Sequence, residues 1–364
     1  MKHIYFTVTN DLSYDQRMHR ICNSLAGHGY TVTLVGRALP FSKSLEKKAF
    51  KQKRIKCIFN TGFLFYAEYN IRLFFFLLQQ KPDAVCAIDL DTILPCLLIS
   101  KIYRIQRAYD AHEYFTELKE VRIRPVIKKF WSLIEHICVP QYHYGYTVSE
   151  GIADHFAASY HRNYSVIRNM PLLLSITNEP KSEKFLFYGG AVNEGRGFEV
   201  LIPAMKHIAY KLVIAGDGNF MGQVKILIEQ HKVSNKIVLT GMISPDELRR
   251  YSARATLGLS FTEKEGLHHH YALPNKFFDY MHAGLPQITM NLPEYKKINE
   301  NYEVAVLIND LKEETLVATI NSTMSNDVLL RRLRDNGLKA KEIFHWGADE
   351  AKLIKFYQKL LPIE

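Results

Sequence analysis

The chain has 364 residues, 47% of them hydrophobic and 23% charged, which is the balance of a globular protein large enough for two domains. No apolar run approaches the roughly 20 residues that a membrane-spanning helix needs, and the N-terminal stretch has no signal-peptide cleavage pattern. The five cysteines are odd in number and have no CxxC spacing, so we expect a cytoplasmic protein with reduced thiols.

The net charge of +10 is unevenly distributed along the chain. Residues 1–175 contain 23 Lys/Arg and 14 Asp/Glu, a net +9, whereas residues 176–364 contain 24 and 23, a net +1. A basic first half favours an anionic partner for that half alone. Residues 119–131 mix basic residues with Val, Ile, Phe and Trp, a pattern as typical of a membrane-surface segment as of a solvated basic face.

The first half alternates short apolar runs with longer amphipathic ones, which predicts β-α-β units and a parallel sheet. The expected strands cover residues 3–8, 30–37, 83–89, 107–113 and 144–149, and the expected helices cover 14–29, 92–105 and a segment beginning at Ser149.

The segment 168–184 contains two prolines and little periodicity, which predicts a linker. The alternation then restarts, with strands expected at 184–190, 211–218, 236–241, 255–261, 286–290 and 303–308. In such sheets ligands bind at the carboxyl ends of strands, so the candidate residues are those that directly follow a strand.

Two glycine-containing turns follow strands of the second half. In "FYGGAVNEGRG", Gly189 and Gly190 allow backbone N–H groups to approach an anion, and Arg196 can bind a diphosphate in bidentate fashion. In "AGDG", Gly216 can shape the same cleft. Both turns can equally be structural, and the absence of GxGxxG argues against a dinucleotide dehydrogenase.

The segment "LPNKFFDYMHAGLP" predicts a helix that starts near Asn275. Lys276 opposes the helix dipole there, so a bound anion explains it better than a structural role. Asp279 lies near the same face and can accept hydrogen bonds from a ribose diol, or can simply be a charge near the helix start. The adjacent histidines 268–270 lack the i, i+4 spacing of helical metal ligands, so we expect no metal.

Polar residues also follow strands of the first half. His112 and Glu113 lie at the carboxyl end of the expected strand 107–113, and a neutral His112 can hydrogen-bond a substrate hydroxyl or pack at the strand end. Asp15 and Arg17 lie in the first β-to-α loop, where they can meet an acceptor or a phosphate, or form a surface contact with each other.

In this order, these segments together with "IDLDTILP", "YTVSEGI" and "FHWGADEAKLIKFYQKLL" resemble the retaining glycosyltransferases of the GT-B fold, family 4 (glycosyl transferases group 1), over nearly the whole chain. The resemblance implies two facing Rossmann-like domains, 1–172 on the acceptor side and 173–345 on the donor side. It also implies that a helix within 346–364 returns to the first domain. The donor would be a nucleotide-diphosphate sugar, and neither a cofactor nor a metal would be needed.

The resemblance also assigns roles to single residues. It implies that Arg196 and Lys276 hold the diphosphate, that Asp279 is the second acid of the Glu-x7-Glu motif and binds the ribose, and that His112 lies near the transferred sugar. The donor site would further include Gly189, Gly190, Gly216 and Asn275, and the acceptor side would include Asp15, Arg17 and Glu113.

The first acid of that motif is displaced. An alignment without gaps puts Tyr271 in its place, and Glu265 lies fourteen residues before Asp279 instead of eight. Either an insertion lets Glu265 still reach the sugar, or residues among 268–271 take over its role.

We therefore predict a retaining glycosyltransferase that moves a sugar from a nucleotide-diphosphate sugar to a glycan or lipid-linked acceptor, in cell-surface polysaccharide biosynthesis. The basic first domain predicts peripheral contact with an anionic membrane, and we expect no nucleic-acid partner. Two alternatives stay open: a nucleotide-sugar epimerase of the same fold, and a catalytically silent sugar-nucleotide or glycan-binding protein, which the displaced acid favours.

Overall fold

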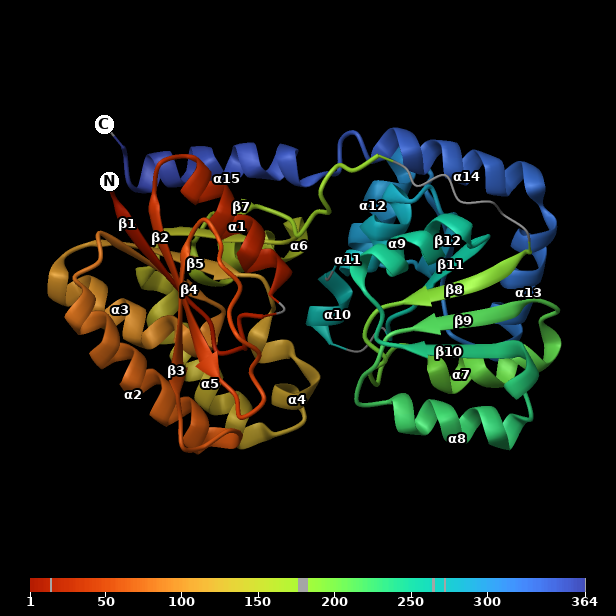
Figure 1. Ribbon diagram of the computed structural model, residues 1–364, viewed down its shortest axis with the longest axis horizontal. Helices are drawn as coiled ribbons and strands as arrows, with labels where there is room; N and C mark the ends of the chain where they lie inside the picture. The colour runs from red at the N-terminus through yellow and green to blue at the C-terminus, as the bar shows by residue number, and fades with distance from the viewer. Residues whose placement is uncertain (14, 176–182, 264–265, 272, 364) are drawn as a thin grey trace. The chain divides into compact units, whose positions relative to one another are not determined.

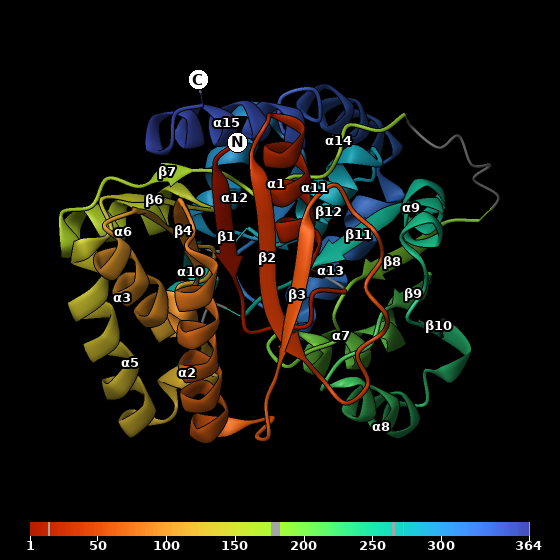
Figure 2. The ribbon, with the colours of Figure 1, turned by 60° about the vertical axis from the view of Figure 1, so that its left-hand side comes forward.

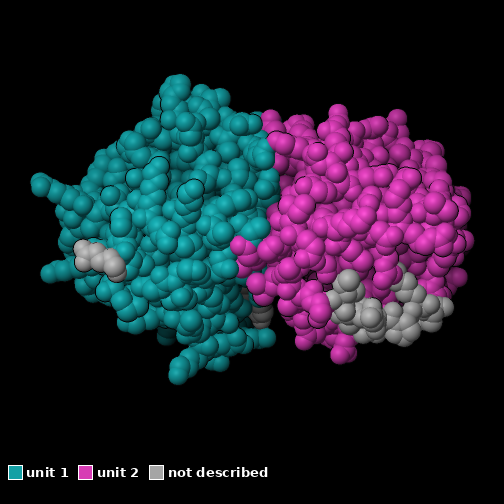
Figure 3. All heavy atoms as spheres, turned by 90° about the horizontal axis from the view of Figure 1, so that it is seen from above, with its two compact units in different colours: residues 1–169, 266–268, 348–364 teal, residues 170–265, 269–347 magenta. Residues whose placement is uncertain are grey.

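The computed structural model describes residues 1–13, 15–175, 183–263, 266–271 and 273–363. The chain divides into two compact units, coloured separately in Figure 3. Unit 1 comprises Met1–Asn169, Gly266–His268 and Ala348–Glu364, and unit 2 comprises Met170–Glu265 and His269–Gly347. Each unit contains one parallel sheet covered by helices, which confirms the expected α/β class (Figure 1).

The sheet of unit 1 has seven parallel strands in the order β3-β2-β1-β4-β5-β6-β7. Its central strands are buried, which is why they were recognisable as apolar runs. The edge strand β3, "KQKRIK", was not predicted, because a strand paired on one side only can be polar. The strands are β1 (His3–Thr7), β2 (Thr31–Ala38), β3 (Lys51–Lys56), β4 (Ala84–Ile88), β5 (Gln106–Ala111), β6 (Tyr144–Thr147) and β7 (Ser165–Val166).

Two of the helices of unit 1 begin at a side-chain cap. The Asp15 side chain accepts a hydrogen bond from the Met18 N–H, so the first helix begins at Gln16. Ser149 caps the helix predicted to begin there. The helices are α1 (Gln16–Gly27), α2 (Gly62–Gln80), α3 (Ile93–Tyr103), α4 (Lys119–Arg122), α5 (Pro125–Cys138), α6 (Glu150–Tyr160) and α15 (Trp346–Leu360).

The last helix, α15, completes the core of unit 1. The Tyr357 ring is fully buried, and its centroid lies 5.7 Å from that of Phe6 and 6.4 Å from that of Tyr30. The Tyr30 hydroxyl donates a hydrogen bond to the Leu361 carbonyl at 3.0 Å. The end of the chain therefore packs against the first strands, as the sequence predicts.

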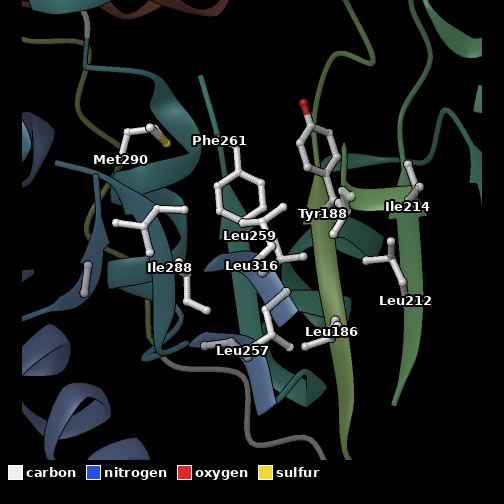
Figure 4. Close-up of a cluster of buried hydrophobic side chains, with 14 of the residues drawn as sticks. Leu186, Tyr188, Leu212, Ile214, Leu257, Leu259, Phe261, Ile288, Met290 and Leu316 are labelled. Carbon is white, nitrogen blue, oxygen red and sulfur yellow. The ribbon is translucent and has the colours of Figure 1, made fainter. Parts of the chain in front are cut away.

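Unit 2 has six parallel strands in the order β10-β9-β8-β11-β12-β13, around an aliphatic and aromatic core (Figure 4). The strands are β8 (Phe185–Gly189), β9 (Lys211–Ala215), β10 (Ile237–Gly241), β11 (Leu257–Ser260), β12 (Gln287–Met290) and β13 (Ala305–Ile308). The helices are α7 (Phe198–Ala204), α8 (Met221–His231), α9 (Pro245–Arg254), α11 (Asn275–His282), α12 (Pro293–Tyr302), α13 (Glu313–Ser325) and α14 (Asp327–Ala340), and the short α10 (Leu267–Tyr271) precedes α11. Among the helices that the structure describes, none combines the length and the apolarity that crossing a membrane requires.

Candidate active site

The glycine turns of unit 2 lie against each other at the carboxyl ends of β8 and β9. The Gly190 N–H donates to the Ala215 carbonyl at 2.8 Å, and Gly216, at φ +149°, is so close that a Cβ on it would lie 1.9 Å from the Gly190 oxygen. Only glycine fits such an approach. The Gly189 N–H donates to the Tyr280 hydroxyl at 2.9 Å, which ties this turn to α11.

Lys276, in the first turn of α11, lies against this glycine turn. Its Nζ is 3.6 Å from the centroid of the Tyr188 ring, and a Cβ on Gly190 would be 3.7 Å from its Cε. Part of the Lys276 stem is exposed, but Nζ is buried and has no hydrogen-bond partner among the residues that the structure describes. Burial, and secondly the charge of Arg196, lower the pKa of Lys276 well below its usual value.

Arg196 approaches the same place from the loop before α7. Its Nη1 donates to the Thr262 hydroxyl at 2.9 Å, and the loop is tied down by a hydrogen bond from the Glu263 N–H to the Gly195 carbonyl. The effect of Arg196 on the pKa of Lys276 places the two cations near each other. A buried amine beside a guanidinium makes a site that an anion would complete, because the anion would favour the protonated form of Lys276.

The other predicted donor residues lie on or near α11. Asn275 is exposed at its first position, and Asp279 is partly exposed one turn later, where its charge raises the pKa of Lys276 against the larger effect of burial. Tyr271 is partly buried, and its ring centroid lies 4.9 Å from that of His270. Glu265 lies outside the described residues, so its expected role stays a prediction.

In unit 1, His112 is paired with an acid that the sequence analysis did not single out. The His112 Nδ1 lies 2.8 Å from the Asp89 Oδ2, with the geometry of an ion pair and not of a well-directed hydrogen bond. Burial by itself lowers the pKa of His112, but the Asp89 carboxylate outweighs it, and the pKa rises to about 10. The Asp89 carboxylate thus favours the imidazolium form of His112 over the neutral form considered from the sequence.

Further carboxyl groups surround this ion pair at the ends of β4 and β5. The Glu113 N–H donates to the Asp89 Oδ1 at 3.0 Å. Burial, and secondly the Asp89 charge, raise the pKa of Glu113 and that of Asp91 to about 7. The Asp91 carboxylate accepts a hydrogen bond from the Thr9 hydroxyl. The group combines one imidazolium with carboxyl groups that can accept hydrogen bonds from hydroxyls.

The predicted acceptor role of Arg17 is not compatible with its position. The side chain is 4% exposed, and its guanidinium donates to both Asp110 carboxylate oxygens, at 2.8 and 3.2 Å, and to the Ile167 carbonyl. Arg17 is thus a buried structural residue, and it does not pair with Asp15. The Asp15 carboxylate accepts hydrogen bonds from the Met18 N–H and the Asn10 amide, so it holds the start of α1.

The sequence analysis missed three residues that contact predicted site residues: Asp89, Tyr188 and Thr262, which contact His112, Lys276 and Arg196. Asp89 could have been found, because it ends a predicted strand whose neighbour ends at His112, and carboxyl ends of adjacent parallel strands meet. Tyr188 and Thr262 carry no such signal, since an aromatic in a strand and a hydroxyl after one are ordinary features. Beneath Thr262, the Ser260 and Tyr295 hydroxyls are buried and have no hydrogen-bond partner within the described part of the chain.

Comparison with known proteins relates the unit 2 site to a family. Residues 172–340 match the family model described as glycosyl transferases group 1. A curated relative, chitobiosyldiphosphodolichol beta-mannosyltransferase of Candida albicans, is 22% identical over 167 residues, which are 43% of this chain and 36% of the relative. The match thus spans little more than a third of that relative's length.

Solved structures match over the whole chain. Sucrose-phosphate synthase from Thermosynechococcus elongatus has a TM-score of 0.83 at 14% identity, covering 99% of both chains. Anabaena Alr3699/HepE in complex with UDP and glucose has a TM-score of 0.80 at 12% identity, covering 99% of this chain and 100% of that one. At such identities the likeness defines the fold, which is the GT-B fold of glycosyltransferases.

Fold and family agree with the prediction. Residues 172–340, which contain the glycine turns, Arg196 and Lys276, match the glycosyl transferases group 1 family. The predicted enzyme class, a glycosyltransferase, is confirmed at this level.

Proposed function

We propose that the protein is a retaining glycosyltransferase that moves a sugar from a nucleotide-diphosphate sugar to a glycan or lipid-linked acceptor. The observation that carries the proposal is the Nζ of Lys276, which is buried beside Arg196 and the Gly190 turn and has no hydrogen-bond partner in the described part of the chain. An ammonium group buried without a partner costs free energy, and a diphosphate would remove that cost.

The chemistry of unit 2 is stabilisation of a leaving group. As the bond between the sugar and the diphosphate breaks, negative charge grows on the diphosphate oxygens. Lys276 and Arg196 lie ready to bind that charge, and their positions are fixed before the reaction by Tyr188 and Thr262. The positive charge that a diphosphate needs is thus supplied by side chains. Asp279, one turn further along α11, would accept hydrogen bonds from the ribose hydroxyls.

The chemistry of unit 1 concerns the sugar and the acceptor. The imidazolium of His112 can donate a hydrogen bond to a sugar hydroxyl, and the Asp89 carboxylate keeps it charged and fixes its orientation. Glu113 and Asp91 have pKa values of about 7, so each can accept a hydrogen bond from an acceptor hydroxyl or take up its proton near neutral pH.

The names of similar proteins support the substrate classes. One structure was solved with UDP and glucose, and the curated relative is named for a diphosphodolichol-linked chitobiose. We therefore extend the proposal to a nucleotide-sugar donor and a lipid-linked acceptor used in cell-surface polysaccharide synthesis at the cytoplasmic face of a membrane.

A thermal-shift panel of nucleoside diphosphates and their sugars tests the donor assignment. A ligand that binds only the native state stabilises it by a free energy that grows logarithmically with its concentration relative to its Kd, and so raises the unfolding temperature more, the tighter it binds at a fixed concentration; the panel therefore also identifies the base. No shift by any diphosphate would refute the proposal. With the donor known, product analysis distinguishes the activities: an epimerase converts the donor without an acceptor, a silent binding protein leaves it intact, and a retaining transferase preserves the anomeric configuration.

A further inference from the structure

One side of unit 1 is apolar where a helical layer normally faces water. Helices α2, α3 and α5 cover one face of the sheet, and each also carries a row of exposed apolar side chains. We call these rows together the apolar face: Leu64, Ile71 and Phe75 of α2; Leu94, Leu98 and Ile102 of α3; Val126, Phe130, Leu133 and Ile137 of α5. The outward side of such helices is ordinarily polar, so a continuous apolar face indicates a binding surface.

The three helices form one continuous layer. Helix α3 packs against both α2 and α5, and the three lie side by side in Figures 1 and 2. Helices α2 and α5 also meet directly, because the Phe63 and Phe130 ring centroids are 5.4 Å apart and those of Tyr66 and Trp131 are 5.3 Å apart.

The spacing of the exposed residues shows that they lie on a different side of each helix from the side chains that pack into the core. In α5, Trp131, Glu135 and Cys138 point into unit 1, and the exposed row follows a second side of the helix at positions i, i+4, i+7 and i+11 from Val126. In α3 the exposed row recurs every four residues from Leu94. Both helices are thus apolar on two sides, one for the core and one for a partner.

The charges around the apolar face select the kind of partner. Within α2, α3 and α5, all fully described, the acids are Glu68 and Glu135, and both have mostly buried side chains. The bases there are Arg72, Lys101, Lys128 and Lys129. A second copy of this chain would bring the same positive charges against these, whereas a bilayer with anionic head groups offers both an apolar interior and negative charge.

We propose that the apolar face is a membrane-docking surface that inserts its side chains between the head groups of an anionic bilayer, with the lysines at head-group level. The inference rests on the proposed function, because a lipid-linked acceptor requires an enzyme at the bilayer. It extends the expected contact from the segment 119–131, whose second half lies in α5, to a surface made by three helices, in which hydrophobic insertion acts together with charge.

Flotation with phosphatidylglycerol/phosphatidylcholine vesicles, at low and at high salt, tests the proposal. In the variant Leu98→Gln/Leu133→Gln, at sites 43% and 57% exposed, we expect the partition coefficient at high salt to fall about tenfold or more. In Lys101→Gln/Lys129→Gln, we expect a fall of about tenfold or more at low salt and a smaller one at high salt.

The matched control lies on unit 2. Ile226→Gln/Val328→Gln removes apolar side chains 49% and 66% exposed and should leave vesicle binding unchanged. All these sites are exposed, so the variants should keep the unfolding temperature of the parent, which excludes misfolding as a cause. Failure of the parent to bind anionic vesicles would overturn the proposal. So would loss of binding in the control alone, or a change in oligomeric state of the Leu98→Gln/Leu133→Gln variant in light scattering, which would make the face a contact between copies.

The vesicle measurement is independent of the donor assignment. If diphosphates stabilise the protein but vesicles are not bound, the docking surface is wrong and the glycosyltransferase proposal is unaffected. If vesicles are bound and no diphosphate stabilises the protein, the glycosyltransferase proposal is wrong and the docking surface is unaffected.

Discussion

The substitution Lys276→Met distinguishes the contribution of this residue to ligand binding from the free energy of folding that its burial costs. In the absence of ligand, the buried Nζ has no hydrogen-bond partner within the described residues, a situation that costs about 1–3 kcal/mol. Methionine keeps an unbranched apolar stem against the Tyr188 ring and removes the charge. We therefore expect the variant to be more stable than the parent by about 1–2 kcal/mol at neutral pH.

This gain should depend on pH in a defined direction. The folded-state pKa of Lys276 lies below the unfolded value near 10.5, so folding disfavours the protonated amine. The penalty is complete below the folded-state pKa and disappears as the pH rises toward 10.5. The stability advantage of Lys276→Met should therefore grow as the pH falls from 10.5 toward the folded-state pKa and shrink in alkaline buffer.

Thermal unfolding with and without the nucleoside diphosphate found by the panel measures both effects. Without ligand, we expect the unfolding temperature of the variant to rise by about 2–4 °C per kcal/mol gained, the scale for a unit of this size. We expect its affinity for the diphosphate to be lower by about 10–150-fold, the equivalent of about 1.5–3 kcal/mol for a charged hydrogen bond. Lys225→Met, an exposed position on α8, is the matched control and should change neither. Equal stability and equal affinity in Lys276→Met and the parent would refute the reasoning.

Four further outcomes are expected. Arg196→Ala should slow transfer by about 10–150-fold with unchanged unfolding, and an unchanged rate would remove Arg196 from the diphosphate site. Asp89→Asn should lower the pKa of His112 from about 10, so the alkaline limb of the pH–rate profile should move to lower pH. The substitution should also destabilise the fold. In the parent, the stabilisation by this ion pair is fully present below pH 6.5 and is lost as the pH rises through about 10. Gly216→Ala should lower the unfolding temperature and weaken diphosphate binding, because its Cβ would lie 1.9 Å from the Gly190 oxygen; normal binding would contradict the tight contact. Transfer should continue in EDTA, and activity that returns only with added Mg²⁺ would show that side chains do not supply all the positive charge.

The sequence predicted what depends on local pattern. Buried parallel strands appear as apolar runs and Ser149 as a helix start, so most of both sheets was predicted, whereas the polar edge strand β3 has no such pattern. Arg17 was misplaced because its partner Asp110 is 93 residues away, and position in a loop gives no sign of burial. The Asp89 partner of His112 was missed for the same reason, since the two residues meet only when β4 and β5 pair.

The position of Tyr357 has a consequence for biosynthesis. Because α15 follows all of unit 2 in the chain, residues such as Phe6 stay without their full packing until unit 2 has been synthesised. Unit 2, whose chain is continuous apart from the small segment assigned to unit 1, can complete its own core before unit 1 does. The N-terminal half of the chain therefore exposes hydrophobic surface for longer during synthesis, which favours aggregation at that stage.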